Sequence, residues 1–125
     1  MMIKNWVYST KKTDFRFIET EAGNDYGYVY AVRLNVTAKF SLLKIGATRM
    51  PYVRFYNFGR NANLFCLSPA HKNFWENEEI LHEVFSECRI PSRPGRGVQA
   101  ELFNMSMPYF FKHLPEMSYL GVNEK

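Results

Sequence analysis

The sequence predicts a small α+β domain, because strand-like and helix-like patterns follow one another within 125 residues. Aromatic and β-branched residues alternate from 26 to 34, and a second apolar run spans 42–47, as is typical of two neighbouring strands. A third short run at 63–67 also has strand character. From 73 to 88, apolar residues recur at helical spacing and glutamates fill the polar side, which predicts an amphipathic helix.

The first two strands are expected to pair antiparallel, and the alternation within each strand sorts its side chains by face. Tyr28 and Tyr30 then share one face of the sheet, while Lys44 and Gly46 share one side of the second strand. Ahead of these strands, residues 1–25 form an N-terminal extension that could add a further strand.

Two shorter helices complete the predicted elements. The first spans about 50–58, where a proline suits the first turn and Gly59 ends the helix, so that Arg54 lies in mid-helix. The second spans 107–114. Residues 90–97 carry two prolines and two glycines, and are therefore expected to form an irregular basic loop.

Composition and charge favour one ordered domain with an anionic partner. The chain is 46% hydrophobic and 17% aromatic, and its formal net charge of +4 favours polyanionic partners such as nucleic acid. Cys66 and Cys88 match no common zinc or thioredoxin spacing and are expected to be buried free thiols. No run approaches the roughly 20 apolar residues that cross a bilayer, and residues 1–12 are too polar for a signal peptide. A cytoplasmic protein that binds no membrane is expected.

The charges are segregated along the chain. Residues 26–75 contain no Asp or Glu, yet they carry seven Lys and Arg residues. Because a surface without carboxylates attracts phosphates rather than repelling them, this segment is interpreted as a phosphate-facing site.

One carboxylate stands alone near the end of the chain. Between Cys88 and Pro115 the only acidic residue is Glu101, and three arginines precede it. Pairing with a neighbouring Arg is one interpretation. Metal binding is the other, because Mg²⁺ often takes one or two protein carboxylates and completes its shell with water and substrate phosphate.

Five short motifs occur in a particular order, and together they resemble the GIY-YIG nuclease superfamily, most closely its small phage and bacterial branch. They are Tyr28-Val29-Tyr30, Lys44-Ile45-Gly46, Arg54, Glu79-x-x-His82 and Glu101-Leu102-Phe103. The resemblance implies a three-stranded antiparallel sheet flanked by helices over residues 26–125, in the cytoplasm of a bacterium or a phage-infected cell. It also implies a DNA endonuclease or nickase that hydrolyses phosphodiester bonds with one Mg²⁺ or Mn²⁺ ion.

The resemblance assigns a role to each matching residue. Tyr30, with Tyr28 as the next choice, matches the first tyrosine, and Lys44 stands where a second tyrosine usually lies. Arg54 matches the helix arginine, Glu101 the metal ligand, and His82 the second helix. The physical chemistry agrees, because a free phenol titrates near pH 10 and needs a cation such as the Lys44 ammonium to favour the phenolate. The planar guanidinium of Arg54 suits a phosphoryl transition state.

Each assignment has a structural alternative. Tyr28 and Tyr30 could pack inside the hairpin, Gly46 could serve only close packing, and His82 could contact an acid one turn earlier on its helix. The chain also departs from the family pattern, since a lysine replaces the second tyrosine and Phe58 stands where many members have a histidine.

Contacts to DNA are expected mainly with backbone phosphates, through five arginines. They are Arg49, Arg60, Arg89, Arg93 and Arg96. The competing function is a catalytically silent module on the same scaffold that binds nucleic acid, nucleotides or a protein. A third interpretation is a protein-interaction domain that uses the acidic helix face between Glu76 and Glu87.

Overall fold

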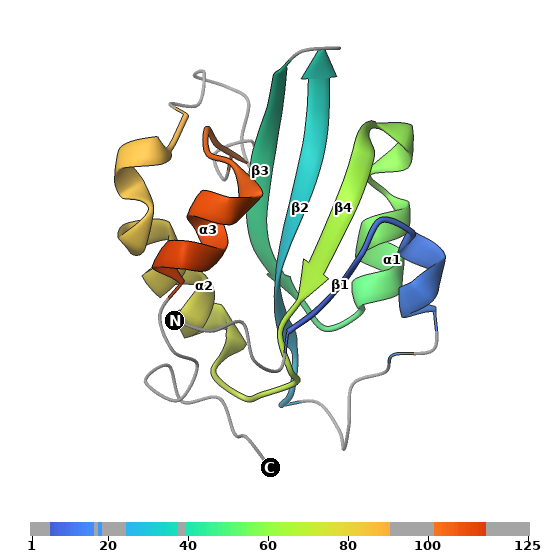
Figure 1. Ribbon diagram of the computed structural model, residues 1–125. Helices are drawn as coiled ribbons and strands as arrows, with labels where there is room; N and C mark the ends of the chain where they lie inside the picture. The colour runs from blue at the N-terminus through green and yellow to red at the C-terminus, as the bar shows by residue number, and fades with distance from the viewer. Residues whose placement is uncertain (1–5, 17, 19–24, 38–39, 91–101, 115–125) are drawn as a thin grey trace, which may run out of the picture.

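The computed structural model describes residues 6–16, 18, 25–37, 40–90 and 102–114. Within these residues, five strands form one antiparallel sheet in the order β1-β4-β2-β3-β5, and three α-helices cover it (Figure 1). The predicted α+β class is confirmed. The predicted three-stranded sheet is wrong, because a short strand extends the sheet at each edge.

The elements have the following bounds. The strands are β1 (Val7–Ser9), β2 (Tyr28–Thr37), β3 (Phe40–Thr48), β4 (Ala62–Leu67) and β5 (Leu102–Phe103), and the α-helices are α1 (Pro51–Tyr56), α2 (Phe74–Val84) and α3 (Met107–His113). Single 3-10 turns form η1 (Lys12–Phe15), η2 (Gly59–Asn61) and η3 (Ser86–Cys88).

The two edge strands come from outside the three predicted strand segments. Val7 of β1 pairs with Leu67 of β4, and Leu43 of β3 pairs with Phe103 of β5. The N-terminal segment also supplies Phe15, which is fully buried. With three and two residues, β1 and β5 are too short to show a strand periodicity in the sequence.

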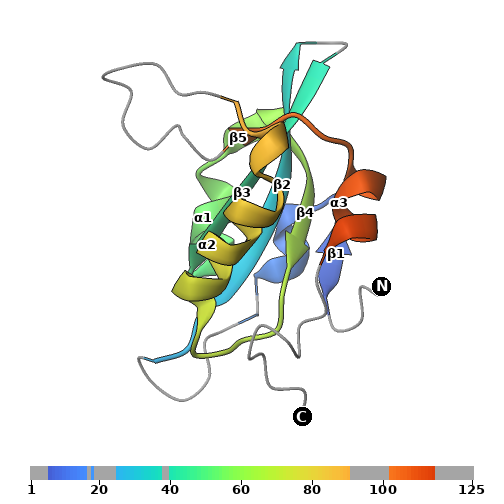
Figure 2. The same cartoon turned by 90° about the vertical axis from the view of Figure 1, so that its left-hand side faces the viewer.

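The sheet has a core on each face. Val29 and Ala31 of β2 point to the side covered by α2 and α3, which is called the α2 face below. Tyr28, Tyr30 and Val32 point to the side covered by η1 and α1, which is called the α1 face. In Figure 2, α2 lies in front of the sheet and α1 behind it. The central strands are buried on both faces because their apolar side chains alternate and meet a helix on either side.

Helix α2 packs through a narrow stripe. Phe74, Asn77 and Leu81 are its buried residues, and Phe85 continues the line at the end of the helix. Val84 is one of the apolar residues at helical spacing in the predicted helix 73–88, but its side chain is 44% exposed. The reason is angular, because positions spaced by three, four and four residues fill the buried stripe and leave Val84 on the flank.

Asn77 is buried because it completes a polar network with His71. The Nδ2 of Asn77 lies 3.0 Å from Nε2 of His71, and Nδ1 of His71 lies 2.8 Å from the carbonyl oxygen of Pro69. Backbone hydrogen bonds between His71 and Gly27 join this network to the start of β2. These contacts fit a neutral imidazole that donates from Nδ1 and accepts at Nε2. Burial lowers the pKa of His71, and the hydrogen bond to Pro69 opposes the shift in part.

The α1 face contains a close contact across the central hairpin. Tyr30 pairs with Gly46, and a Cβ atom added to Gly46 would lie 2.6 Å from Cζ of the Tyr30 ring. The Tyr30 hydroxyl lies against the same glycine. Any side chain at position 46 would therefore displace the ring.

Replacing Gly46 with alanine is expected to lower the free energy of unfolding by about 1–3 kcal/mol, the usual cost of overpacking a core. The Tyr30 ring cannot move away freely, because Phe55 and Phe58 contact it. Urea denaturation of the wild type and of Gly46→Ala measures the change. In a Tyr30→Ala background the same substitution should cost much less. Equal costs in the two backgrounds would show that the ring and the glycine are not in contact.

The stability of the protein is expected to fall as the pH drops below about 6.5, the ordinary pKa of histidine. The folded-state pKa of His71 is lower than this value, so the unfolded chain binds the additional proton and acid favours unfolding. Comparing urea denaturation of the wild type and His71→Gln from neutral to acidic pH isolates the effect. The variant should be less stable at neutral pH, and the difference should shrink in acid. Parallel pH profiles would contradict the assignment.

Candidate functional site

The antiparallel hairpin brings three of the predicted site residues to the α1 face. Tyr28 pairs with Thr48, Tyr30 with Gly46, and Val32 with Lys44. Directly opposed residues of an antiparallel pair point to the same side, so Lys44 shares the face of the two tyrosines. Helix α1 covers this face and carries Arg54, which is exposed.

Both tyrosines are packed rather than displayed. Tyr28 is 4% exposed and Tyr30 is 2% exposed. The Tyr30 ring meets Phe55 and Phe58 edge to face, with centroid distances of 5.7 and 6.0 Å. This is the structural alternative raised for strand tyrosines, and in this conformation the phenol is shielded from bulk solvent.

Arg54 is exposed and lines an open hollow of about 270 Å³ at the junction of β3 and α1. The chain turns there because Oγ1 of Thr48 accepts a hydrogen bond of 3.0 Å from the backbone N–H of Met50, and a proline then begins the helix. Thr48 is of a residue type that commonly caps helices, but Met50 holds the N-cap position of α1. The lining residues are Thr48, Arg49, Met50, Val53, Arg54 and Asn57.

This hollow can bind an anion. It is lined by two guanidinium groups, from Arg49 and Arg54, together with the hydroxyl of Thr48 and the amide of Asn57, and its described lining includes no carboxylate. Sequence reasoning did not single out Asn57. The signal that could have found it is its spacing of three residues after Arg54, which places both on one side of a helix.

The proposed metal ligand lies outside the described residues. Glu101 is not among them, and neither are Arg93 and Arg96. Leu102, which follows Glu101 in the chain, pairs with Lys44 at the edge of the sheet. Within the described segments, no group of three or more His, Cys, Asp or Glu side chains could hold a metal ion.

His82 lies on the opposite face from the tyrosines. Its Nε2 lies 3.0 Å from the carbonyl oxygen of Ile45, and Oε2 of Glu78 is 3.7 Å away. The His82 ring also packs on Phe103, with a centroid distance of 5.3 Å. The structure therefore does not bring His82 together with Tyr30 and Arg54. His82 instead joins α2 to β3, and its acidic neighbour, Glu78, is one turn earlier on the helix.

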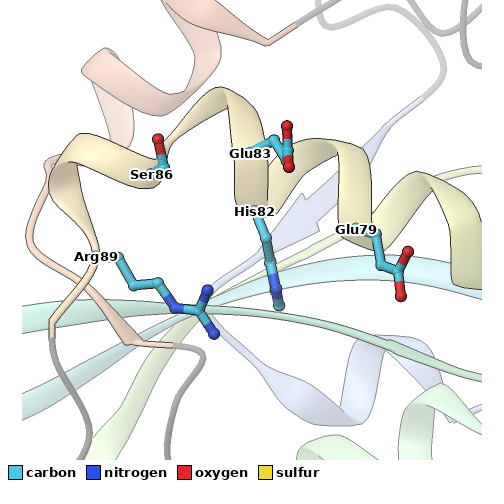
Figure 3. A pocket seen from close by; sticks show the side chains of 5 residues that line it. All are labelled: Glu79, His82, Glu83, Ser86 and Arg89. Carbon is cyan, nitrogen blue, oxygen red and sulfur yellow. The ribbon is translucent and has the colours of Figure 1, made fainter.

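A second hollow of about 470 Å³ adjoins His82 (Figure 3). Its described lining consists of Glu79, His82, Glu83, Ser86 and Arg89. In Figure 3, His82 points toward the strands and the Arg89 guanidinium extends to the same side, whereas Glu83 and Ser86 project away from them. The carboxylates make this hollow less suited to phosphate than the hollow beside α1.

Of the predicted phosphate-binding arginines, the three that the structure describes do not line one hollow. Arg49 lines the hollow beside α1, and Arg60 is exposed in η2, which follows α1 closely in the chain. Arg89 belongs to the hollow beside His82 instead. The α1 face therefore offers the more uniformly basic surface.

The two cysteines take no part in either hollow. Both are free thiols, as predicted, although Cys88 is only partly buried. Burial raises the pKa of the Cys66 thiol to about 12, with Arg33 opposing the shift, so this thiol stays protonated and unreactive at neutral pH.

Two further observations complete the description. None of the helices in the described segments has the length and apolar character needed to cross a membrane. Comparisons with protein-family models, curated proteins and solved structures found no match to this chain.

Proposed function

We propose that this chain is a DNA endonuclease or nickase that depends on a divalent metal and has a GIY-YIG-like scaffold. One observation carries the proposal: the pairing of β2 with β3 sets Tyr28, Tyr30 and Lys44 on one face of the sheet. The helix that covers this face, α1, carries Arg54. These are four of the six residues that the motif order selects for catalysis. All four come from the segment 26–75, which lacks carboxylates.

Arg54 and Arg49 would bind the scissile phosphate in the hollow beside α1. Their planar guanidinium groups match phosphate oxygens, and the charge that builds up on phosphorus during attack strengthens those hydrogen bonds. Attack of a water oxygen on phosphorus forms one P–O bond and breaks the bond to the leaving oxygen of the sugar. The arginines stabilise that transition state more than the bound DNA.

Tyr30 would accept the proton of the attacking water as a phenolate, and the Lys44 ammonium on the neighbouring strand favours that charged form. In the conformation described here, Phe55 and Phe58 cover the ring. Proton transfer therefore requires a local movement of α1 and of the turn that follows it, which carry Phe55 and Phe58. Phe58 lies outside the α-helix, ahead of the Gly59 turn, whose φ is +73°.

A divalent cation on this face would depend on Glu101. The segments β2, β3, α1 and β4 contain no carboxylate, and Asp14 of η1 already accepts a hydrogen bond of 2.5 Å from Ser9. A single carboxylate fits Mg²⁺ or Mn²⁺, which completes its shell with water and substrate phosphate. When bound, the cation polarises the phosphoryl oxygen and the leaving group.

The burial of Tyr30 favours a second candidate function. A phenol that is 2% exposed and lies against Gly46 serves packing well and is poorly placed for proton transfer. In that case the scaffold is a catalytically silent module, and the two guanidinium groups beside α1 bind the phosphates of nucleic acid or nucleotides. The two candidates differ in cleavage: the nuclease needs a carboxylate to cleave DNA, whereas the silent module binds without cleaving.

Purified protein is expected to nick supercoiled plasmid in the presence of Mg²⁺ or Mn²⁺ and to lose that activity in EDTA. Tyr30→Phe, Arg54→Ala and Glu101→Gln should each reduce the rate about 10²-fold or more, the usual size of a general-base or electrostatic contribution. Tyr30→Phe keeps the ring that packs on Gly46, so it tests the hydroxyl without emptying the core. Conversion of supercoiled to open-circular plasmid is the measurement.

His82→Gln is the matched control, because glutamine can keep a hydrogen bond to the Ile45 carbonyl. It should cleave within a few-fold of the wild type. Full cleavage by Glu101→Gln would overturn the proposed mechanism. Absence of cleavage by the wild type, together with DNA binding that weakens steeply with salt, would establish the silent module instead.

A further inference from the structure

The outer surface of α2 exposes an apolar strip. Ile80 and Val84 are 40% and 44% exposed, although both belong to a helix that packs well on its other side. Trp75 is 55% exposed but lies on the other flank of the helix, five residues before Ile80. Ile80 and Val84 are four residues apart and therefore adjacent on the helix surface. Exposed apolar side chains that gather on one element, rather than being scattered, indicate a contact surface.

Glutamates border this strip. Glu76, Glu79 and Glu83 line, together with Ile80 and Val84, a hollow of about 450 Å³ whose described lining contains no Lys or Arg. Two such surfaces from two copies would bring like charges together, which disfavours a symmetric contact between α2 helices. The surface therefore suits a partner that is both apolar and basic.

The chain carries such a surface on its other side. Met50, Val53 and Tyr56 are each 49–61% exposed at the start of α1 and along it. Met50 and Val53 line the hollow beside α1 together with Arg49 and Arg54. Of the nine large exposed hydrophobic side chains in the described residues, five lie on these two helical surfaces. They match in apolar character and are opposite in charge.

We infer that the acidic outer surface of α2 docks on the basic outer surface of α1 of a second copy of this chain. A single molecule cannot close this contact, because α1 and α2 cover opposite faces of its sheet (Figure 2). The contact is head-to-tail, so each copy keeps one free α1 and one free α2 surface, and association continues into open chains or a ring. This inference does not rest on the nuclease proposal.

The contact is small, since one helix face from each copy buries less than the roughly 1,200 Å² of a stable interface. Self-association is therefore expected at protein concentrations on the order of 100 µM and should weaken as salt screens the charges. Sedimentation velocity over a concentration series, at low and at high salt, measures it. The wild type should show a rising weight-average mass at low salt and a lower one at high salt.

A charge exchange tests the partner surfaces. Glu79→Lys with Glu83→Lys, and separately Arg49→Glu with Arg54→Glu, should each weaken self-association by about tenfold or more. An equimolar mixture of the two variants should associate again, because each supplies the charge that the other lacks. Lys112→Glu on α3 is the control for a change in net charge and should associate like the wild type. Circular dichroism verifies folding, and Arg54→Glu alone replaces the double variant if that variant unfolds.

The outcomes separate the possible contacts. A wild type that remains monomeric at low salt overturns the inference. Undiminished association of the Arg49→Glu, Arg54→Glu variant also overturns it, since α1 would then not be the partner surface. Loss of association in both variants without recovery in the mixture would also overturn the inference. It would show that the glutamates of α2 and the arginines of α1 do not contact one another. Cleavage of plasmid by monomeric protein would leave the nuclease proposal intact in each case.

Discussion

The contact of the Tyr30 ring with Gly46 across the β2–β3 hairpin is the constraint on which the rest of the structure depends. A ring can lie on the opposite strand only where that strand has no side chain, so this pair marks the register. A slip of one residue would turn Tyr30 to the other face and exchange the two cores. Because Phe55 and Phe58 pack on the same ring, the contact also positions α1 and, with it, Arg54.

The two faces of the sheet have different chemistry. The α1 face is built from aromatic rings and is bordered by arginines, whereas the α2 face is built mainly from aliphatic and phenylalanine side chains, and glutamates cover its helix. His82 belongs to the second face through its contact with the Ile45 carbonyl. The motif order alone would combine His82 with Tyr30, but the sheet separates them. Two residues that belong to one set of motifs are therefore not necessarily close in space when a sheet lies between them.

Both proposals use the outer surface of α1. The guanidinium groups of Arg49 and Arg54 are suited to a phosphate, and they are equally suited to the glutamates of α2 from a second copy. If both proposals hold, DNA and self-association compete for the same site, and the acidic helix of a second copy would cover the basic surface of the protein when DNA is absent. The coupling would be electrostatic, so salt would weaken both interactions.

The sequence by itself determined the α+β class, the antiparallel hairpin, the sharing of one face by both tyrosines, and the long amphipathic helix, because local periodicity encodes each of them. The sequence also raised a further strand within residues 1–25, but only the tertiary structure decided that β1 pairs at the β4 edge and that β5 extends the other edge, since two or three residues carry no readable period. It also decided that Tyr30 is enclosed and His82 lies on the far face, and that Val84 remains in solvent while Asn77 is buried. These outcomes depend on how each helix is rotated against the sheet, and that rotation is set by the packing of residues distant in the chain.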